Sequence, residues 1–213
     1  MSPRWEFGVA PLPQVVDAAG ALRRVTSLLL ALEQEAPAVD ELVADLRRAE
    51  AALAALVPAS STPRVGDGVD TDGRTYVDHA RDIGAYDPAF PEYDLTVVDA
   101  TAAHGTVTFP IAYEGPPGIV HGGFLGLFAD CVVQHHSCDA GVAGKTTAMT
   151  VRYRRPAPLD RPLSFTIERA HDGDRLRSVV RLLDGERVLC EAEVEAVAGD
   201  RAALPAVDPR RPA

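Results

Sequence analysis

The chain has few cysteines, almost no lysine and no long apolar run. Its 213 residues contain 3 cysteines, an odd number that does not suit a disulfide framework, so we expect free thiols. Lys145 is the single lysine, and 31 acidic residues against 21 basic ones give a formal net charge of −10. This balance argues against a nucleic-acid footprint and against a basic helix that lies on a membrane surface.

We expect no segment that targets the protein or anchors it to a membrane. No stretch approaches about 18 uninterrupted apolar residues, the length of a membrane-spanning helix. The N-terminal residues Met1–Glu6 lack the continuous apolar core of a signal peptide. We therefore expect a cytoplasmic protein with no membrane partner. A hydrophobic content of 46% suits one globular domain with an accessory piece.

Two helical patterns occupy the first part of the chain. Apolar residues recur at three- and four-residue spacing from Val15 to Leu32 and again from Leu42 to Leu56, with Pro37 between the two patterns. This arrangement predicts a helical hairpin over residues 1–62. A stretch rich in proline, glycine and small polar residues follows, so we predict a linker over 63–74, a main domain over 75–200 and a tail over 201–213.

The main domain has strand patterns on both sides of one apolar helix. A period of two predicts strands at 93–101 and 104–112, before the helix. Four strands are predicted after it, and the segments His171–Asp174 and Asp184–Gly185 are strong hairpin turns because glycine accepts a positive φ at low cost. The sequence therefore predicts an α+β domain in which an antiparallel sheet wraps one buried helix.

The four later strands have apolar residues on one face and charged residues on the other. In the first of them, the apolar face carries Thr147, Met149, Val151 and Tyr153. Alternation of this kind predicts one buried face and one face in contact with water.

The segment Gly118–Asp130 is the strongest candidate for a functional site. Gly122 and Gly123 let a ligand approach the backbone, and the first turn of a helix leaves N–H groups free to bind an oxyanion. Asp130 is the only acidic residue between Phe124 and Gln134, and a carboxylate on an apolar helix requires a reason. The structural alternatives are an interface carboxylate and glycines that only permit close packing.

These residues resemble a known family. The motif His121-Gly-Gly, an acid nine residues later and a threonine-rich strand from Thr146 that ends in Arg-Pro156 are similar to the hotdog-fold acyl-CoA thioesterases of the phenylacetic-acid-pathway type. The resemblance covers about residues 75–198. It implies a hotdog fold, hydrolysis of an acyl-CoA thioester to the free acid and coenzyme A, no cofactor, and a homodimer or a dimer of dimers.

The chemistry of thioester hydrolysis assigns roles to the motif. Asp130 is expected to act as general base or as nucleophile, and the N–H of Gly122, helped by Gly123, is expected to polarise the carbonyl. The resemblance implies that Thr146 orients the nucleophile or water. Thr147 is a close rival, because the length of the preceding loop allows a shift of one residue.

Gln134 and His121, which lie near Asp130 and the two glycines in the sequence, also receive predicted roles. Gln134 lies one helical turn beyond Asp130 on the same face, so we predict that it holds the same water. His121 is predicted to brace the turn or to contact the substrate, because the family carries the acid role on the carboxylate.

Helix geometry predicts that one chain cannot complete the site. Gly122 and Asp130 are eight residues apart, or about 12 Å along a helix axis. A thioester carbonyl must lie about 3 Å from both its oxyanion donor and its attacking group. Two antiparallel copies place the glycine end of one helix beside the aspartate of the other, so we predict an obligate dimer with two equivalent sites.

Other residues are candidates for substrate binding. Coenzyme A carries phosphates, which arginine and lysine bind, and an aromatic segment before the first strand is suited to line an acyl pocket. Solvated charges and plain packing are the alternatives. The candidates are Thr147, Lys145, Arg152, Arg154, Arg155, Phe90 and Tyr93.

Cys131, His135 and Cys138 fall at i, i+4 and i+7 of the central helix, a spacing that suits zinc ligands. Small thiols are nevertheless common on the sheet-facing side of a central helix, and the sequence offers no second ligand cluster. We therefore expect no metal.

Two other functions are compatible with the sequence. One is a non-catalytic module that binds and senses acyl-CoA. Regulators of this kind carry a DNA-binding helical unit, but positions 1–62 contain five basic and eight acidic residues, which argues against DNA binding. The other is an acyl-CoA hydratase, whose relatives use an Asp-x-Asn-Pro-x-His motif that this chain lacks. The heptad-like spacing of the hairpin's second helix suits packing against another subunit.

Overall fold

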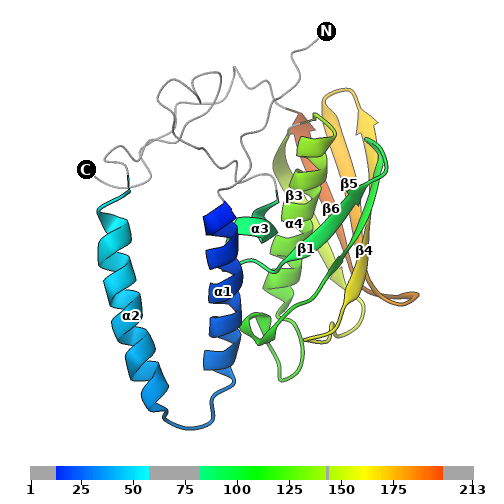
Figure 1. Ribbon diagram of the computed structural model, residues 1–213. Helices are drawn as coiled ribbons and strands as arrows, with labels where there is room; N and C mark the ends of the chain where they lie inside the picture. The colour runs from blue at the N-terminus through cyan, green and yellow to red at the C-terminus, as the bar shows by residue number, and fades with distance from the viewer. Residues whose placement is uncertain (1–12, 58–81, 143, 199–213) are drawn as a thin grey trace.

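The computed structural model describes residues 13–57, 82–142 and 144–198, and it places a helical hairpin beside a sheet and a long helix (Figure 1). Helices α1 (Pro13–Leu30) and α2 (Pro37–Ala54) form the predicted hairpin. Pro37 is the first residue of α2, a position where the N–H of a residue has no partner in the helix. The predicted domain boundaries at 62/63, 74/75 and 200/201 lie outside the described residues.

The rest of the described chain forms one antiparallel sheet and the elements that pack on it. In chain order these are α3 (Ile83–Tyr86), β1 (Tyr93–Val97), β2 (Ala102–Val107), the 3-10 helix η2 (Ile111–Tyr113), α4 (Gly122–Asp139), β3 (Gly144–Tyr153), β4 (Leu163–Asp172), β5 (Arg175–Asp184) and β6 (Arg187–Ala198). Hydrogen-bonded neighbours follow the order β1-β2-β4-β5-β6-β3. This arrangement confirms the predicted α+β class, and it makes β1 and β3 the two edge strands.

Local turn residues set the lengths of the strands. Gly173 and Gly185 have φ angles of 63° and 60° at the two predicted hairpin turns. The first strand is shorter than predicted, because the carboxylate of Asp99 accepts hydrogen bonds from the N–H groups of Thr101 and Ala102 at 2.7 and 3.0 Å. This turn ends β1 at Val97 and starts β2 at Ala102. The second strand begins two residues earlier than predicted and ends at Val107.

Helix α4 lies at the centre of the hydrophobic core. Its residues Phe128 and Val132 are 2% and 0% exposed. The ring of Phe128 lies edge-on to Phe165 of β4 and to Phe109, with centroid distances of 5.2 and 5.4 Å. Burial of these side chains fixes α4 against one face of the sheet, as predicted.

Strand β3 differs from its prediction. Met149, Val151 and Tyr153 point toward the glycines of α4, but Met149 is 40% and Tyr153 is 58% exposed. The prediction of a buried apolar face is therefore wrong for β3 in a single chain. The physical reason is that β3 is an edge strand, so within the described residues no further strand covers its outer side.

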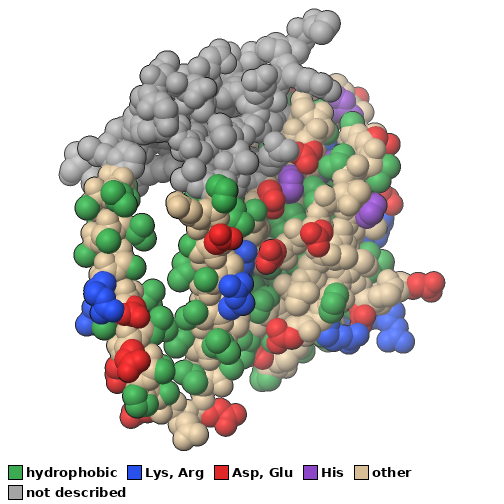
Figure 2. Space-filling model, viewed as in Figure 1, with side chains coloured by type: hydrophobic (Ala, Val, Ile, Leu, Met, Phe, Trp, Pro, Cys, Tyr) green, Lys and Arg blue, Asp and Glu red, His purple; other side chains and the backbone are tan. Residues whose placement is uncertain are grey.

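The two helices of the hairpin contact the main domain differently. Helix α1 is anchored by Arg23, whose buried guanidinium donates to the carbonyl oxygens of Gly84 and Asp87 at 2.8 and 2.9 Å. Helix α2 has no buried residue, and Figure 2 shows hydrophobic side chains along both helices. Packing of α2 against another subunit stays a prediction. Among the described residues, no helix is both long enough and apolar enough to cross a membrane.

Candidate active site

Helix α4 begins directly after His121, which caps it. The Nδ1 atom of His121 accepts a hydrogen bond from the N–H of Gly123 at 3.0 Å. The carbonyl oxygen of His121 accepts a hydrogen bond from the N–H of Phe124 at 2.9 Å. Within the described residues the N–H of Gly122 has no acceptor. Of the two glycines, Gly122 therefore has the N–H that is available to an oxyanion, whereas that of Gly123 is engaged.

The first turn of α4 is also in contact with Tyr153, a residue that the sequence analysis did not place in the site. The hydroxyl of Tyr153 donates to the carbonyl oxygen of Gly122 at 2.9 Å. A Cβ atom added at Gly122 would lie 3.0 to 3.1 Å from the tyrosine ring and hydroxyl, so glycine allows this close approach. The only signal in the sequence was the position of Tyr153 on the apolar side of its strand.

Asp130, Thr146 and Gln134 form one hydrogen-bonded chain. The hydroxyl of Thr146 donates to Oδ1 of Asp130 at 2.7 Å, and it accepts from Nε2 of Gln134 at 2.9 Å. No hydrogen bond from a described residue reaches Oδ2 of Asp130. Asp130 is half-buried. The carboxylate thus has one oxygen held by the protein and one oxygen available to a water or a substrate.

A β-bulge decides which threonine faces Asp130. Strand β3 pairs with β6 with Thr146 opposite Ala196 and Ala148 opposite Glu195, so Thr147 is the extra residue. The hydroxyl of Thr147 donates instead to the carbonyl oxygen of Glu195 at 3.2 Å. Because the bulge reverses the alternation of faces, the side chain toward α4 is that of Thr146 and not that of its rival.

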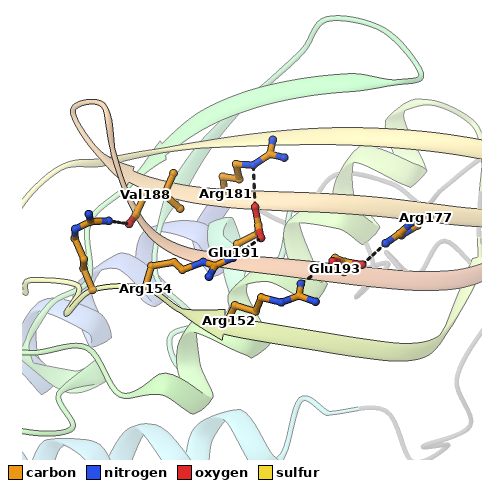
Figure 3. A network of polar contacts seen from close by, with 8 residues as sticks. Arg152, Arg154, Arg177, Arg181, Val188, Glu191 and Glu193 are labelled. Carbon is orange, nitrogen blue, oxygen red and sulfur yellow. Dashed lines mark hydrogen bonds and ion pairs between the residues drawn. The ribbon is translucent and has the colours of Figure 1, made fainter.

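Two of the arginine candidates, Arg152 and Arg154, form ion pairs with glutamates of β6, and the third is bonded to the backbone of β6 (Figure 3). Arg152 contacts Glu193 at 2.6 Å, and Arg154 contacts Glu191 at 3.3 Å. Arg155 donates to the carbonyl oxygen of Val188 at 3.0 Å. The same two glutamates also contact Arg177 and Arg181 of β5. Lys145 is exposed. Contact of these cations with phosphate stays a prediction, since each of the three arginines already has a partner.

Phe90 and Tyr93, the candidates for an acyl pocket, are buried, with exposures of 3% and 8%. The hydroxyl of Tyr93 contacts Nδ1 of His135 at 2.8 Å, and burial raises the pKa of this hydroxyl well above its ordinary value. Tyr93 also lines a cleft of about 650 Å³ between α1 and strands β1 and β2. A second cavity, between α4 and the sheet, holds only about 10 Å³.

The cysteine and histidine side chains of α4 do not form a metal-binding group. Burial raises the pKa of the Cys131 thiol to about 12. His135 contacts Tyr93, and its Nε2 lies 3.5 Å from Asp139. Across the part of the chain that the structure describes, no three His, Cys, Asp or Glu side chains are placed to hold an ion.

Comparison with known proteins agrees with the fold. The chain resembles a thioesterase superfamily protein of known crystal structure, with 28% sequence identity and a TM-score of 0.71, over 92% of this chain and 100% of the other. It matches no protein-family model and no curated protein. The full-length likeness confirms the hotdog fold of the thioesterase superfamily.

Two shorter solved structures show weaker likeness. A hypothetical thioesterase of Streptococcus pneumoniae, crystallised with coenzyme A, has 20% identity and a TM-score of 0.47 over 50% of this chain and 88% of its own. The PaaI protein of the Escherichia coli phenylacetic acid degradation operon has 20% identity and a TM-score of 0.46 over 49% of this chain and 82% of its own. The match over 92% of the chain extends further and includes the N-terminal helices.

Proposed function

We propose that the protein is an acyl-CoA thioesterase that hydrolyses its substrate to a free acid and coenzyme A. The observation that carries this proposal is the presence, on one helix, of an N–H at Gly122 with no acceptor among the described residues and of a carboxylate at Asp130 that Thr146 holds by one oxygen. The full-length likeness to a thioesterase superfamily protein supports it. An oxyanion donor and an oriented carboxylate are the two groups that hydrolysis of a thioester requires.

In the proposed reaction, water attacks the carbonyl carbon and Asp130 takes its proton at Oδ2. The electron pair of the carbonyl bond moves to oxygen, where the N–H of Gly122 at the positive end of the α4 dipole stabilises the charge. Collapse of the tetrahedral intermediate breaks the carbon–sulfur bond, and the thiolate leaves and receives the proton. Direct attack by Asp130 uses the same oxygen and passes through an anhydride that water then hydrolyses.

We propose further that each site combines Gly122 of one copy with Asp130 of another. The two residues are about 12 Å apart on α4, too far to meet at one carbonyl carbon. Exposed apolar side chains lie beside the site on the same chain, among them Leu127 of α4 at 47% and Met149 of β3 at 40% exposure. A second copy that covers this face would bury them and bring the two half-sites together.

The decisive experiment is a panel of acyl-CoA substrates, assayed for release of free thiol, with Asp130→Asn beside the wild type. Loss of the base or nucleophile is expected to lower kcat by more than about a hundredfold. Asparagine still accepts a hydrogen bond from Thr146, so the variant should fold normally. Asp172→Asn, which neutralises an exposed carboxylate at the end of β4, is the matched control and should retain wild-type kcat.

The same panel separates the proposal from its alternative. Equal rates for Asp130→Asn and wild type would remove Asp130 from the mechanism. Calorimetric binding of acyl-CoA without thiol release from any member of the panel would instead favour a sensing module. Thiol release that depends on Asp130 supports the thioesterase.

A further inference from the structure

The peptide unit between Gly122 and Gly123 is held at both of its polar ends. Its carbonyl oxygen, on Gly122, accepts from the hydroxyl of Tyr153 at 2.9 Å. Its N–H, on Gly123, donates to Nδ1 of His121 at 3.0 Å. The two partners come from different elements, since His121 precedes α4 and Tyr153 is the last residue of β3. A peptide plane with both ends bonded has little freedom to rotate.

The contact with Tyr153 contributes little to the core. Tyr153 is 58% exposed, so its ring has no large share in the buried apolar surface. The ring instead lies across the α-carbon of Gly122, where an added Cβ would come within 3.0 to 3.1 Å of it. The exposed ring of Tyr153 thus lies against Gly122, and its hydroxyl bonds the carbonyl oxygen of Gly122. These two contacts indicate a role for Tyr153 in the first turn of α4.

We propose that Tyr153 is a positioning residue that fixes the direction of the oxyanion donor, an inference that rests on the proposed thioesterase activity. With the Gly122–Gly123 peptide fixed by Tyr153 and His121, the neighbouring N–H of Gly122 is held in one orientation and that of Gly123 is withheld from the substrate. Oxyanion donors are effective because they are aligned before charge develops and need no reorganisation during the reaction.

Strand β3 thereby contacts both proposed functional residues of α4, Gly122 and Asp130. Thr146, near its start, contacts Asp130, and Tyr153, at its end, contacts Gly122. The two contacts hold α4 against β3 at Asp130 and at Gly122, the two residues that the proposed reaction uses. Each donor is a hydroxyl, so each contact is removed by a substitution that preserves most of the side chain.

The test is Tyr153→Phe, which keeps the ring and removes the hydroxyl. Loss of an oxyanion donor costs about 100-fold or more, and loss of its alignment is expected to cost less, about tenfold in kcat, with KM for the acyl-CoA changed less than about twofold. Thr150→Val, which removes an exposed hydroxyl from the same strand, is the matched control and should retain wild-type kcat. Unchanged kcat in Tyr153→Phe would overturn the inference.

A double-mutant cycle shows whether Tyr153 acts through Gly122. Gly122→Ala keeps the N–H but makes the tyrosine ring shift by a few tenths of an ångström, because the new Cβ would lie 3.0 Å from it. If both changes disturb the same contact, the double variant loses no more kcat than the larger single loss. Losses that multiply would mean that Tyr153 acts elsewhere and would overturn the inference.

A spectroscopic readout separates this inference from the proposed function. The amide nitrogen of Gly123 belongs to the peptide whose carbonyl Tyr153 bonds, so its ¹⁵N resonance should move in Tyr153→Phe and remain in place in Thr150→Val. If the Gly123 resonance does not move in Tyr153→Phe, the inference that Tyr153 holds this peptide is overturned. If the wild type releases no thiol from any acyl-CoA, the proposed function fails, and the Gly123 resonance alone decides whether Tyr153 holds the peptide.

Discussion

At the scale of single residues, the hydroxyl of Thr146 gives the carboxylate of Asp130 its orientation. A hydroxyl that accepts from an amide has its own hydrogen directed away from that amide. Because Nε2 of Gln134 donates to Thr146, the threonine hydrogen is directed at Oδ1 of Asp130. Gln134 was predicted to hold the same water as Asp130, which stays a prediction, and in the structure its Nε2 contacts Thr146. This chain of three side chains leaves Oδ2 of Asp130 without a hydrogen bond from any described residue.

Replacement of Thr146 by valine should lower kcat by about tenfold, since one hydrogen bond of about 1.4 kcal/mol then no longer orients Asp130. Thr147→Val removes the neighbouring hydroxyl, which bonds a backbone carbonyl, and we expect it to keep a higher kcat than Thr146→Val. Thiol release by both variants provides the measurement. A larger loss of kcat in Thr147→Val than in Thr146→Val would contradict the assignment of Thr146 as the residue that orients Asp130.

At the scale of elements, the C-terminal half of α4 is held by buried polar contacts. Arg169 of β4 donates to the carbonyl oxygen of Val133 and to the hydroxyl of Ser137 at 3.2 and 2.9 Å. Its burial lowers the pKa of the guanidinium to about 10, so it stays charged at neutral pH. His136 is fully buried, and its Nε2 contacts the carbonyl oxygen of Asp99 at 2.8 Å. Its Nδ1 has no partner among the described residues.

His136 should make the fold sensitive to acid. Burial lowers the pKa of this histidine below its ordinary value, so the unfolded chain binds a proton that the folded chain does not. The free energy of unfolding should therefore rise with pH up to about 6.5. The contribution of His136 to it should be lost progressively as pH falls below that value. Denaturant unfolding between pH 5 and pH 8, roughly the range in which histidine titrates, measures this slope. His136→Gln should flatten it, whereas an equal slope in that variant would contradict the role of His136. His104→Gln, at an exposed site, is the matched control.

At the scale of the whole molecule, a single chain leaves its candidate site open on one side. Strand β3 is an edge strand with both Met149 and Tyr153 exposed, and Leu127 of α4, three residues before Asp130, is exposed. Unpaired strand edges and apolar patches of this kind are usual at interfaces between subunits. The helices of the hairpin add a second surface, because α2 buries none of its residues in the chain.

A site shared between two copies can be tested by mixing inactive variants. Gly122→Pro removes the proposed oxyanion N–H at the first helical position and also displaces the ring of Tyr153, whereas Asp130→Asn removes the acid. In a mixed dimer one site has both groups intact and the other has neither. Random mixing should then restore about a quarter of the wild-type activity. If refolded mixtures show no recovery, the two groups do not act across copies.

Much of the fold was predictable because its signals are local. The period of two, the glycines at 173 and 185 and the proline at 37 act within a few residues of where they stand, and the predicted helices and the four later strands follow them. The first strand before α4 was predicted too long, because the hydrogen bonds of Asp99 compete with strand pairing after Val97. The exposure of β3 was missed, because alternation does not distinguish an edge strand from a central one.

The sequence by itself determined the class of the fold, the helix that begins at Gly122 and the isolated acid at Asp130, since these depend on residue type and spacing along the chain. Tertiary structure alone decided which groups meet. The bulge at Thr147 turned Thr146 toward Asp130, and the end of β3 brought Tyr153 onto Gly122. These contacts join residues from different elements, and their geometry depends on strand register and on close packing, which no local pattern encodes.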